Sequence, residues 1–255
     1  MAPGLKPDEA AMLFSVRLTS SPPYNGMTII KTISGLGVSQ EEIQMPENSK
    51  IIFRQGNRGQ KKAAILALHP TQLTVGEKEV AAKAEELSAK TYATLDAHLL
   101  SHIVPVVVGP HDVWNMIDHH HFVLAAYRLG ITHVYSSVVA DWHDLHRNEF
   151  WARMQQENFV YPLDEHGVRH TIDMLPTGIS GLRDDIYRSL AWAARKAGAY
   201  EKTTEPFSEF RWSAFYRQRI AIETLQQDFN LAIELAVSFS HHHSASHMPG
   251  YTHKE

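Results

Sequence analysis

The residues best suited to chemistry form the polar cluster Asp118-His119-His120-His121, which lies between two apolar patterns. The run Val113–Ile117 predicts a strand, and the residues from His120 to Leu129 predict a helix that ends at Gly130. The first turn of a helix carries unpaired N–H groups and a partial positive charge, so an anion such as phosphate can bind there. Imidazoles at that place can donate to the same anion or transfer protons. The alternative is that Asp118 only caps the helix and the histidines are solvated.

A second group of candidates surrounds the start of an earlier helix, expected over residues 74–90. Thr71, Thr74 and Gly76 could hold a phosphate with hydroxyl and backbone N–H groups. The alternative for Thr74 is an N-cap, with Glu77 completing a capping box. Lys83 lies beside the apolar face of this helix, where a half-buried ammonium needs an anionic partner, unless the side chain extends to solvent.

Histidine is the compositional outlier, with 17 residues, whereas cysteine is absent. Any metal must therefore bind His, Asp or Glu, and no disulfide or thiolate site can form. Two pairs at i, i+4 spacing, His98 with His102 and His166 with His170, could each place two imidazoles on one metal, but neither has the His-Glu-x-x-His arrangement. A further polar cluster follows the last expected strand and contains Asp141, His143, Asp144 and His146.

The elements that must position these residues alternate in type from residue 63 to 140. Apolar and β-branched runs predict four strands, and helical periodicity predicts two helices between them, in the order β-α-β-β-α-β. The strands are expected over 63–68, 103–108, 113–117 and 133–140, and the helices over 74–90 and 120–129.

The flanking regions have a different character. Residues 1–62 read as an N-terminal extension with short strands at Ser15–Thr19 and Met27–Ile33, ending in a polar run over 54–62 that resembles a linker. Residues 146–255 form a helical C-terminal region around a long loop over 158–181. The four helices are expected over 146–157, 182–198, 209–219 and 222–239, and the tail from Ser240, with its run His241–His243, is expected to be exposed.

Residues 63–145 resemble the ParB/sulfiredoxin superfamily. There a strand, a short polar motif and a helix with paired alanines closing on glycine form a phosphate-binding corner, and Ala125-Ala126 and Gly130 stand at the matching distance from the polar cluster. The segment from Leu68 to Lys83, with Pro-Thr-Gln-Leu-Thr-Val-Gly at its centre, is similar to the putative ParB-like nuclease family, as is the ending Pro249-Gly250-Tyr251. The resemblance covers residues 64–251 and implies an α+β fold, a small mixed sheet with helices followed by a helical region.

Departures from the superfamily pattern limit what the resemblance implies about activity. Phe122 stands where partition proteins, which bind CTP, have a phosphate-gripping arginine. The sulfiredoxin cysteine is absent. Gln72 stands near the place where free-serine kinases carry a catalytic glutamate, and an amide can orient a nucleophile but cannot act as a general base.

Composition excludes several classes of protein. The chain has 255 residues, 44% hydrophobic and 20% charged, as expected for a soluble globular protein. We see no apolar stretch near the ~18 residues of a membrane span and no signal-peptide pattern at the start, so we expect a cytoplasmic location. The net charge of −4, and acids interleaved with the basic residues from Arg183 to Arg219, make nucleic acid an unlikely partner.

The resulting hypothesis is an enzyme that binds a nucleotide or phosphorylated small molecule and transfers or hydrolyses its phosphate. Asp118, His120, His121 and Gln72 are the expected catalytic residues. Mg²⁺ or another divalent ion is expected at Asp118. The expected ligand-binding residues are Thr71, Thr74, Gly76, Lys83 and His119. The alternative is a non-catalytic nucleic-acid-binding or partner-binding module, and the oligomeric state is left open.

Overall fold

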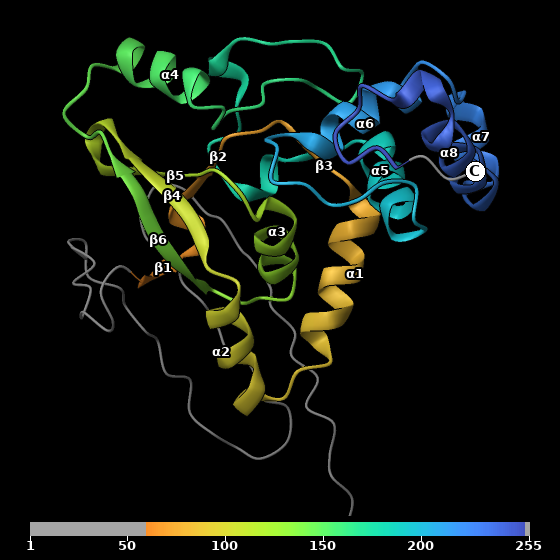
Figure 1. The fold of residues 1–255 in the computed structure, drawn as a ribbon. Helices are drawn as coiled ribbons and strands as arrows, with labels where there is room; N and C mark the ends of the chain where they lie inside the picture. The colour runs from red at the N-terminus through yellow and green to blue at the C-terminus, as the bar shows by residue number, and fades with distance from the viewer. Residues whose placement is uncertain (1–59, 253–255) are drawn as a thin grey trace, which may run out of the picture. The chain divides into compact units, whose positions relative to one another are not determined.

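The computed structural model describes residues 60–252, all within one compact unit that spans Arg54–Glu255 (Figure 1). The short strands expected at Ser15–Thr19 and Met27–Ile33 lie outside the described residues. No helix in the described part of the chain is long and apolar enough to cross a membrane.

A mixed five-stranded sheet forms the centre of the fold, as expected for an α+β protein. Its order is β1-β6-β4-β5-β2, with β1 antiparallel to β6, β6 parallel to β4, β4 antiparallel to β5 and β5 parallel to β2. The strands are β1 (Gln60–Ala64), β2 (Leu68–Pro70), β4 (Val104–Gly109), β5 (Val113–Met116) and β6 (His133–Asp141).

The apolar run expected as one strand over 63–68 is divided between two strands at opposite edges of the sheet. A 3₁₀ turn at Ile65–Ala67 separates β1 from β2. Four gaps between strands span about 19 Å in a flat sheet, which is more than a three-residue connection can cover at about 3.3 Å per residue, so the sheet must curl. Residues 60–62 belong to β1, so the strand begins within the run that was interpreted as a linker.

Helices α1 (Glu77–Ser88) and α3 (His120–Arg128) pack together and against one face of the sheet. Helix α2 (Tyr92–Ser101) was not predicted. Thr74 is not the N-cap of α1, because Thr74–Val75 form strand β3, which pairs with β7 (Arg183–Asp184) in a second, two-stranded sheet. The predicted capping box is therefore absent, and Gly76 is the N-cap.

Helix α4 (Arg147–Gln156) and most of the segment 158–181 cover the other face of the central sheet, whereas Ile179 packs in the core of the first face. Phe150 and Met154 of α4 pack with Val107 of β4 and with Val160. The segment contains 3₁₀ turns at Ile172–Met174 and Ile179–Gly181, and an isolated bridge joins Gln72 to Tyr161.

The C-terminal helices α5 (Ile186–Lys196), α6 (Ser208–Arg217), α7 (Ile222–Gln227) and α8 (Phe229–His241) share a core around Trp212. The single helix expected over 222–239 is two helices, because the Asp228 side chain accepts hydrogen bonds from the N–H groups of Asn230 and Leu231 and so begins α8.

The tail after α8 was expected to be exposed, and that expectation is confirmed for residues 242–244 and 246–247 but wrong for the residues between and after them. A 3₁₀ turn follows at His243–Ala245, and Ala245 and Met248 are buried in the core of the C-terminal helices. The indole N–H of Trp212 donates to the carbonyl of Pro249 at 2.8 Å, so this segment is part of the folded domain.

Candidate functional site

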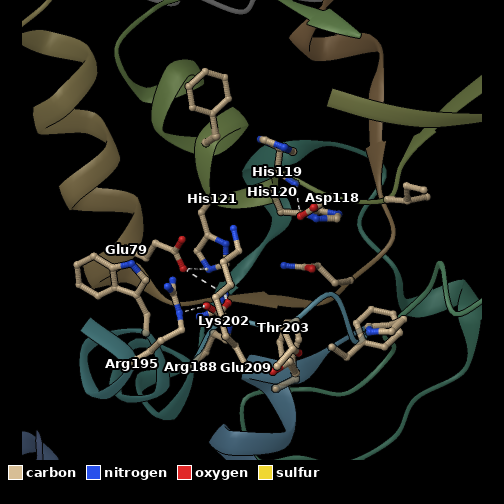
Figure 2. Close-up of a pocket in the computed structure, with 18 of the residues that line it drawn as sticks. Glu79, Asp118, His119, His120, His121, Arg188, Arg195, Lys202, Thr203 and Glu209 are labelled. Carbon is tan, nitrogen blue, oxygen red and sulfur yellow. Dashed lines mark hydrogen bonds and ion pairs between the residues drawn. The ribbon is translucent and has the colours of Figure 1, made fainter. Parts of the chain in front are cut away.

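A cavity of about 770 Å³ opens between the start of α3 and the C-terminal helices (Figure 2). One wall consists of α1 and residues 117–122, and the other consists of α5 and residues 202–210. A cavity of this volume can hold a drug-sized or nucleotide-sized molecule.

The polar cluster lies on the first of these walls. His119 has a left-handed backbone, with φ of 65°, and is the N-cap of α3, while the Asp118 carboxylate accepts from the His119 N–H at 2.6 Å. Asp118, His119, His120 and His121 all line the cavity. The first-turn N–H groups of α3 lack partners within the helix, so this corner combines anion-binding donors with an exposed carboxylate.

His120 and His121 use their Nε2 atoms to hold the chain before α1. His120 Nε2 accepts from the Thr71 N–H at 3.2 Å, and His121 Nε2 accepts from the Gly76 N–H at 2.9 Å. Burial lowers the pKa of His120 to about 3, and burial with the nearby charge of Arg188 lowers the pKa of His121 well below its usual value. Both imidazoles are therefore neutral at pH 7, with their acceptor nitrogens already engaged by backbone.

This arrangement predicts a pH dependence of stability. Unfolded His120 binds a proton below pH 6.5, whereas folded His120 does so only near pH 3. The free energy of unfolding should therefore decrease as the pH is lowered from 6.5 towards 3. The slope from this residue is up to about 1.4 kcal/mol per pH unit. His120→Gln retains an acceptor for the Thr71 N–H but cannot titrate, so urea denaturation between pH 7 and 5 should show a shallower slope. Identical slopes for the two proteins would contradict a buried neutral His120.

Gln72 and Lys83 also line the cavity, so the structure brings Gln72 together with Asp118, His120 and His121. The Gln72 side chain donates to the Thr74 carbonyl at 2.7 Å. Lys83 Nζ lies 3.8 Å from Glu79 Oε1, and this pair partly neutralises the ammonium.

Thr71, Thr74 and Gly76, expected to bind phosphate, do not line the cavity. The Thr71 hydroxyl donates to the Met116 carbonyl at 2.9 Å, and Thr74 is buried. A Cβ atom at Gly76 would lie 2.7 Å from the Ser189 backbone nitrogen, so glycine is needed there for the close approach of α5. The contacts of these three residues join the chain before α1 to neighbouring elements of the fold.

A network of charges around the buried Arg188 and Glu79 crosses the cavity wall and was not predicted. Arg188 Nη2 lies 3.1 Å from Glu79 of α1 and also pairs with Glu209 of α6, which contacts Arg195 at 2.8 Å. Burial alone would lower the pKa of Arg188. The negative charges of Glu209 and Glu79 have the larger combined effect and raise it. Only the i, i+4 spacing of Glu79 and Lys83 could be found in the sequence, because the other partners are more than ten residues apart.

Comparison with known proteins identifies the family. A family model described as "Putative ParB-like nuclease" matches residues 61–218, which is more than half of the chain. The chain belongs to this family. It is similar to a solved structure, protein Atu1540 from Agrobacterium tumefaciens, with 41% sequence identity and a TM-score of 0.72, covering 77% of this chain and 97% of that chain. No curated protein matches the chain.

The ParB-like match includes every residue that lines the cavity, from Gln72 to Phe210. Both walls therefore belong to the family domain, including α5 and α6 of the C-terminal helices. Phe122 is buried and stacks on His102 with ring centroids 4.8 Å apart.

Residues 60–252 of this ParB-like protein contain no group of three or more His, Asp or Glu side chains placed to hold a metal ion. His98 Nε2 lies 3.6 Å from Glu86, and His102 Nδ1 bonds to the His98 carbonyl at 2.9 Å. His170 pairs with Asp164 at 2.7 Å instead of with His166. The carboxylate of Asp118 is the one predicted metal ligand that faces the cavity, and Mg²⁺ commonly binds through one or two carboxylates together with substrate phosphates.

Proposed function

We propose that this ParB-like protein binds a nucleotide or another phosphorylated small molecule in the cavity and hydrolyses or transfers its phosphate. The observation that carries the proposal is the position of Asp118 at the N-terminus of α3, on the wall of a cavity large enough for such a ligand. The family description names a nuclease, which adds hydrolysis of a phosphate ester to the reactions to be tested.

A helix N-terminus on one wall and cations on the other favour a ligand with phosphate groups. The N-terminus of α3 contributes a partial positive charge on one side. The opposite wall carries Arg188, Arg195, Lys196 and Lys202, with Glu205 and Glu209 as its acids, and Glu205 pairs with Arg211, which is outside the cavity. The first wall also carries Glu79, Glu86 and Asp118 against Lys83, so the attraction for an anion comes from the N-terminus of α3 and from the cations of the opposite wall.

Asp118 and His119 are the residues we assign to the chemistry. A divalent ion shared by Asp118 and the ligand would neutralise charge that develops on the phosphate. His119 lies next to Asp118, and burial lowers its pKa, although Asp118 opposes that effect, so its imidazole is neutral at pH 7 and can accept a proton. In hydrolysis a water oxygen bonds to phosphorus, the bond to the leaving group breaks, and the proton of the water passes to His119.

His120, His121 and Gln72 have a supporting role in this proposal. Their hydrogen bonds to Thr71, Gly76 and Thr74 fix the chain between β2 and α1 against the start of α3. Lys83 offsets negative charge at the edge of the cavity.

The test is a screen of nucleoside triphosphates, phosphate monoesters and short oligonucleotides with Mg²⁺ or Mn²⁺, scored by released phosphate, ADP or AMP. We expect turnover with at least one donor. Ligand binding without any turnover would favour the binding-module alternative over an enzyme.

Binding to duplex DNA is expected to be weak. The net charge is −4, and acids alternate with the cations of the cavity wall, so few phosphates can be neutralised at once. The dissociation constant at physiological salt should be no tighter than the non-specific range of ~10⁻⁴ to 10⁻⁶ M. Fluorescence anisotropy with a labelled duplex measures this constant, and nanomolar, sequence-selective binding would establish a nucleic-acid-binding protein instead.

A further inference from the structure

Lys202 and Lys196 are the two cations of the cavity with no acidic partner within 4.0 Å among the described residues, and Lys202 has no aromatic ring contact either. Arg188 and Arg195 are paired with Glu209, Lys83 is paired with Glu79, and Lys196 lies 5.3 Å from the ring centroid of Trp192. Lys202 lines the same cavity (Figure 2). A cation that faces a cavity and is not neutralised by the protein is suited to bind an anionic ligand group.

Lys202 and the start of α3 lie on opposite walls of this cavity. Residues 202–210 form part of one wall, and residues 117–122 form part of the other.

The C-terminal segment Pro249–Tyr251, called the strap below, holds the chain next to Lys202. The Glu201 N–H donates to the Gly250 carbonyl at 2.9 Å, and the buried Trp212 indole donates to Pro249 at 2.8 Å. Gly250 has φ of 71°, and a Cβ atom there would overlap the Glu201 carbonyl oxygen. Glycine is required at this position by both the backbone angle and the close approach.

We infer that Lys202 binds a phosphate group of the ligand opposite the N-terminus of α3, and that the strap is the element that positions Lys202. The inference rests on the proposed function for the identity of the ligand and adds a binding residue on the second wall. The conformation of the Pro-Gly-Tyr ending would then contribute to binding, because it fixes the chain next to Lys202. The ligand it implies carries two or more anionic groups, one at each wall.

The first experiment measures binding of tripolyphosphate by calorimetry at fixed ionic strength. Lys202→Gln should weaken binding roughly tenfold or more, since it removes one charge-assisted hydrogen bond. Lys90→Gln has the same net charge but lies outside the cavity, and it should bind as the wild type does. Equal affinity of wild type and Lys202→Gln would overturn this inference alone, whereas no binding by the wild type would overturn the proposed function.

The second experiment tests the strap by limited trypsin digestion, which cuts after Lys202 and after Lys90 in the connection between α1 and α2. Gly250→Ala should accelerate cleavage after Lys202 by roughly tenfold while leaving cleavage after Lys90 unchanged, because the disturbed contact is local. Gly130→Ala is the matched control, since Gly130 also has positive φ, 75°, but has no neighbour near its Cβ position.

Trp212→Phe removes the donor to Pro249 together with part of the packing of the C-terminal core, and it serves if Gly250→Ala does not fold. A selective increase in cleavage after Lys202, together with weaker tripolyphosphate binding, supports the strap. Equal acceleration at both sites, or no acceleration at either, would show that the strap does not position Lys202.

Discussion

Replacement of Asp118 by asparagine should lower the turnover of any phosphate donor by a factor of at least ~10², the usual effect of removing one electrostatic contact to a transition state. The substitution preserves the size of the side chain and the acceptor for the His119 N–H, so the start of α3 should keep its shape. What is lost is the negative charge that would share a divalent ion with the ligand. Steady-state rates with saturating Mg²⁺ measure the effect.

A matched control separates loss of catalysis from loss of fold. Asp144→Asn changes an exposed carboxylate that does not line the cavity, so its rate should equal that of the wild type. The midpoints of thermal unfolding of both variants should stay near that of the wild type. Equal turnover by wild type and Asp118→Asn would remove Asp118 from the reaction, and the phosphate would then have to be activated elsewhere in the cavity.

The first wall of the site could be predicted because its determinants are local in sequence. A strand, four polar residues and an amphipathic helix follow each other without interruption from Val113 to Arg128, and the structure forms these elements at nearly the expected bounds. The position of Gln72 on the same cavity required the pairing of β2 with β5. The resemblance to the ParB/sulfiredoxin superfamily supplied that arrangement, and periodicity alone did not.

The functions of single residues were harder to predict, because they depend on partners distant in the chain. Thr74 has the sequence context of an N-cap, but it pairs with Arg183, which is more than one hundred residues away. His120 and His121 have the composition of a reactive pair, but their acceptor nitrogens bind the N–H groups of Thr71 and Gly76. Propensity does not specify such contacts, and tertiary structure overrides it.

The second wall was missed for the same reason. The sequence predicted helices over 182–198 and 209–219 with acids interleaved among the basic residues, and Arg188 was not distinguished from the other cations of these helices. In the structure Arg188 is 4% exposed and joins α1 to α6 through two glutamates. A buried arginine between two acids can be recognised only after the helices have been packed.

Arg188→Met should lower the free energy of unfolding by about 3–5 kcal/mol, the usual cost of removing one partner from a buried ion pair. The substitution fills the same space but leaves Glu79, which is 8% exposed, without its closest cation, and removes one of two cations from Glu209. Desolvated carboxylates without compensation are the main source of the penalty. Urea denaturation at pH 7 measures the difference from the wild type.

Two further variants separate the charge effect from packing. Arg195→Met removes a more exposed cation that contacts only Glu209, so we expect a loss of about 1 kcal/mol or less. Arg188→Met combined with Glu79→Gln removes one uncompensated carboxylate and should recover part of the stability lost in the single variant. A loss below about 1 kcal/mol for Arg188→Met would contradict a dominant role of the ion pairs in joining α1 to α5 and α6. Because α1 and α5 lie on opposite walls of the cavity, a large loss would also mean that the stability of the domain and the shape of the cavity depend on the same side chain.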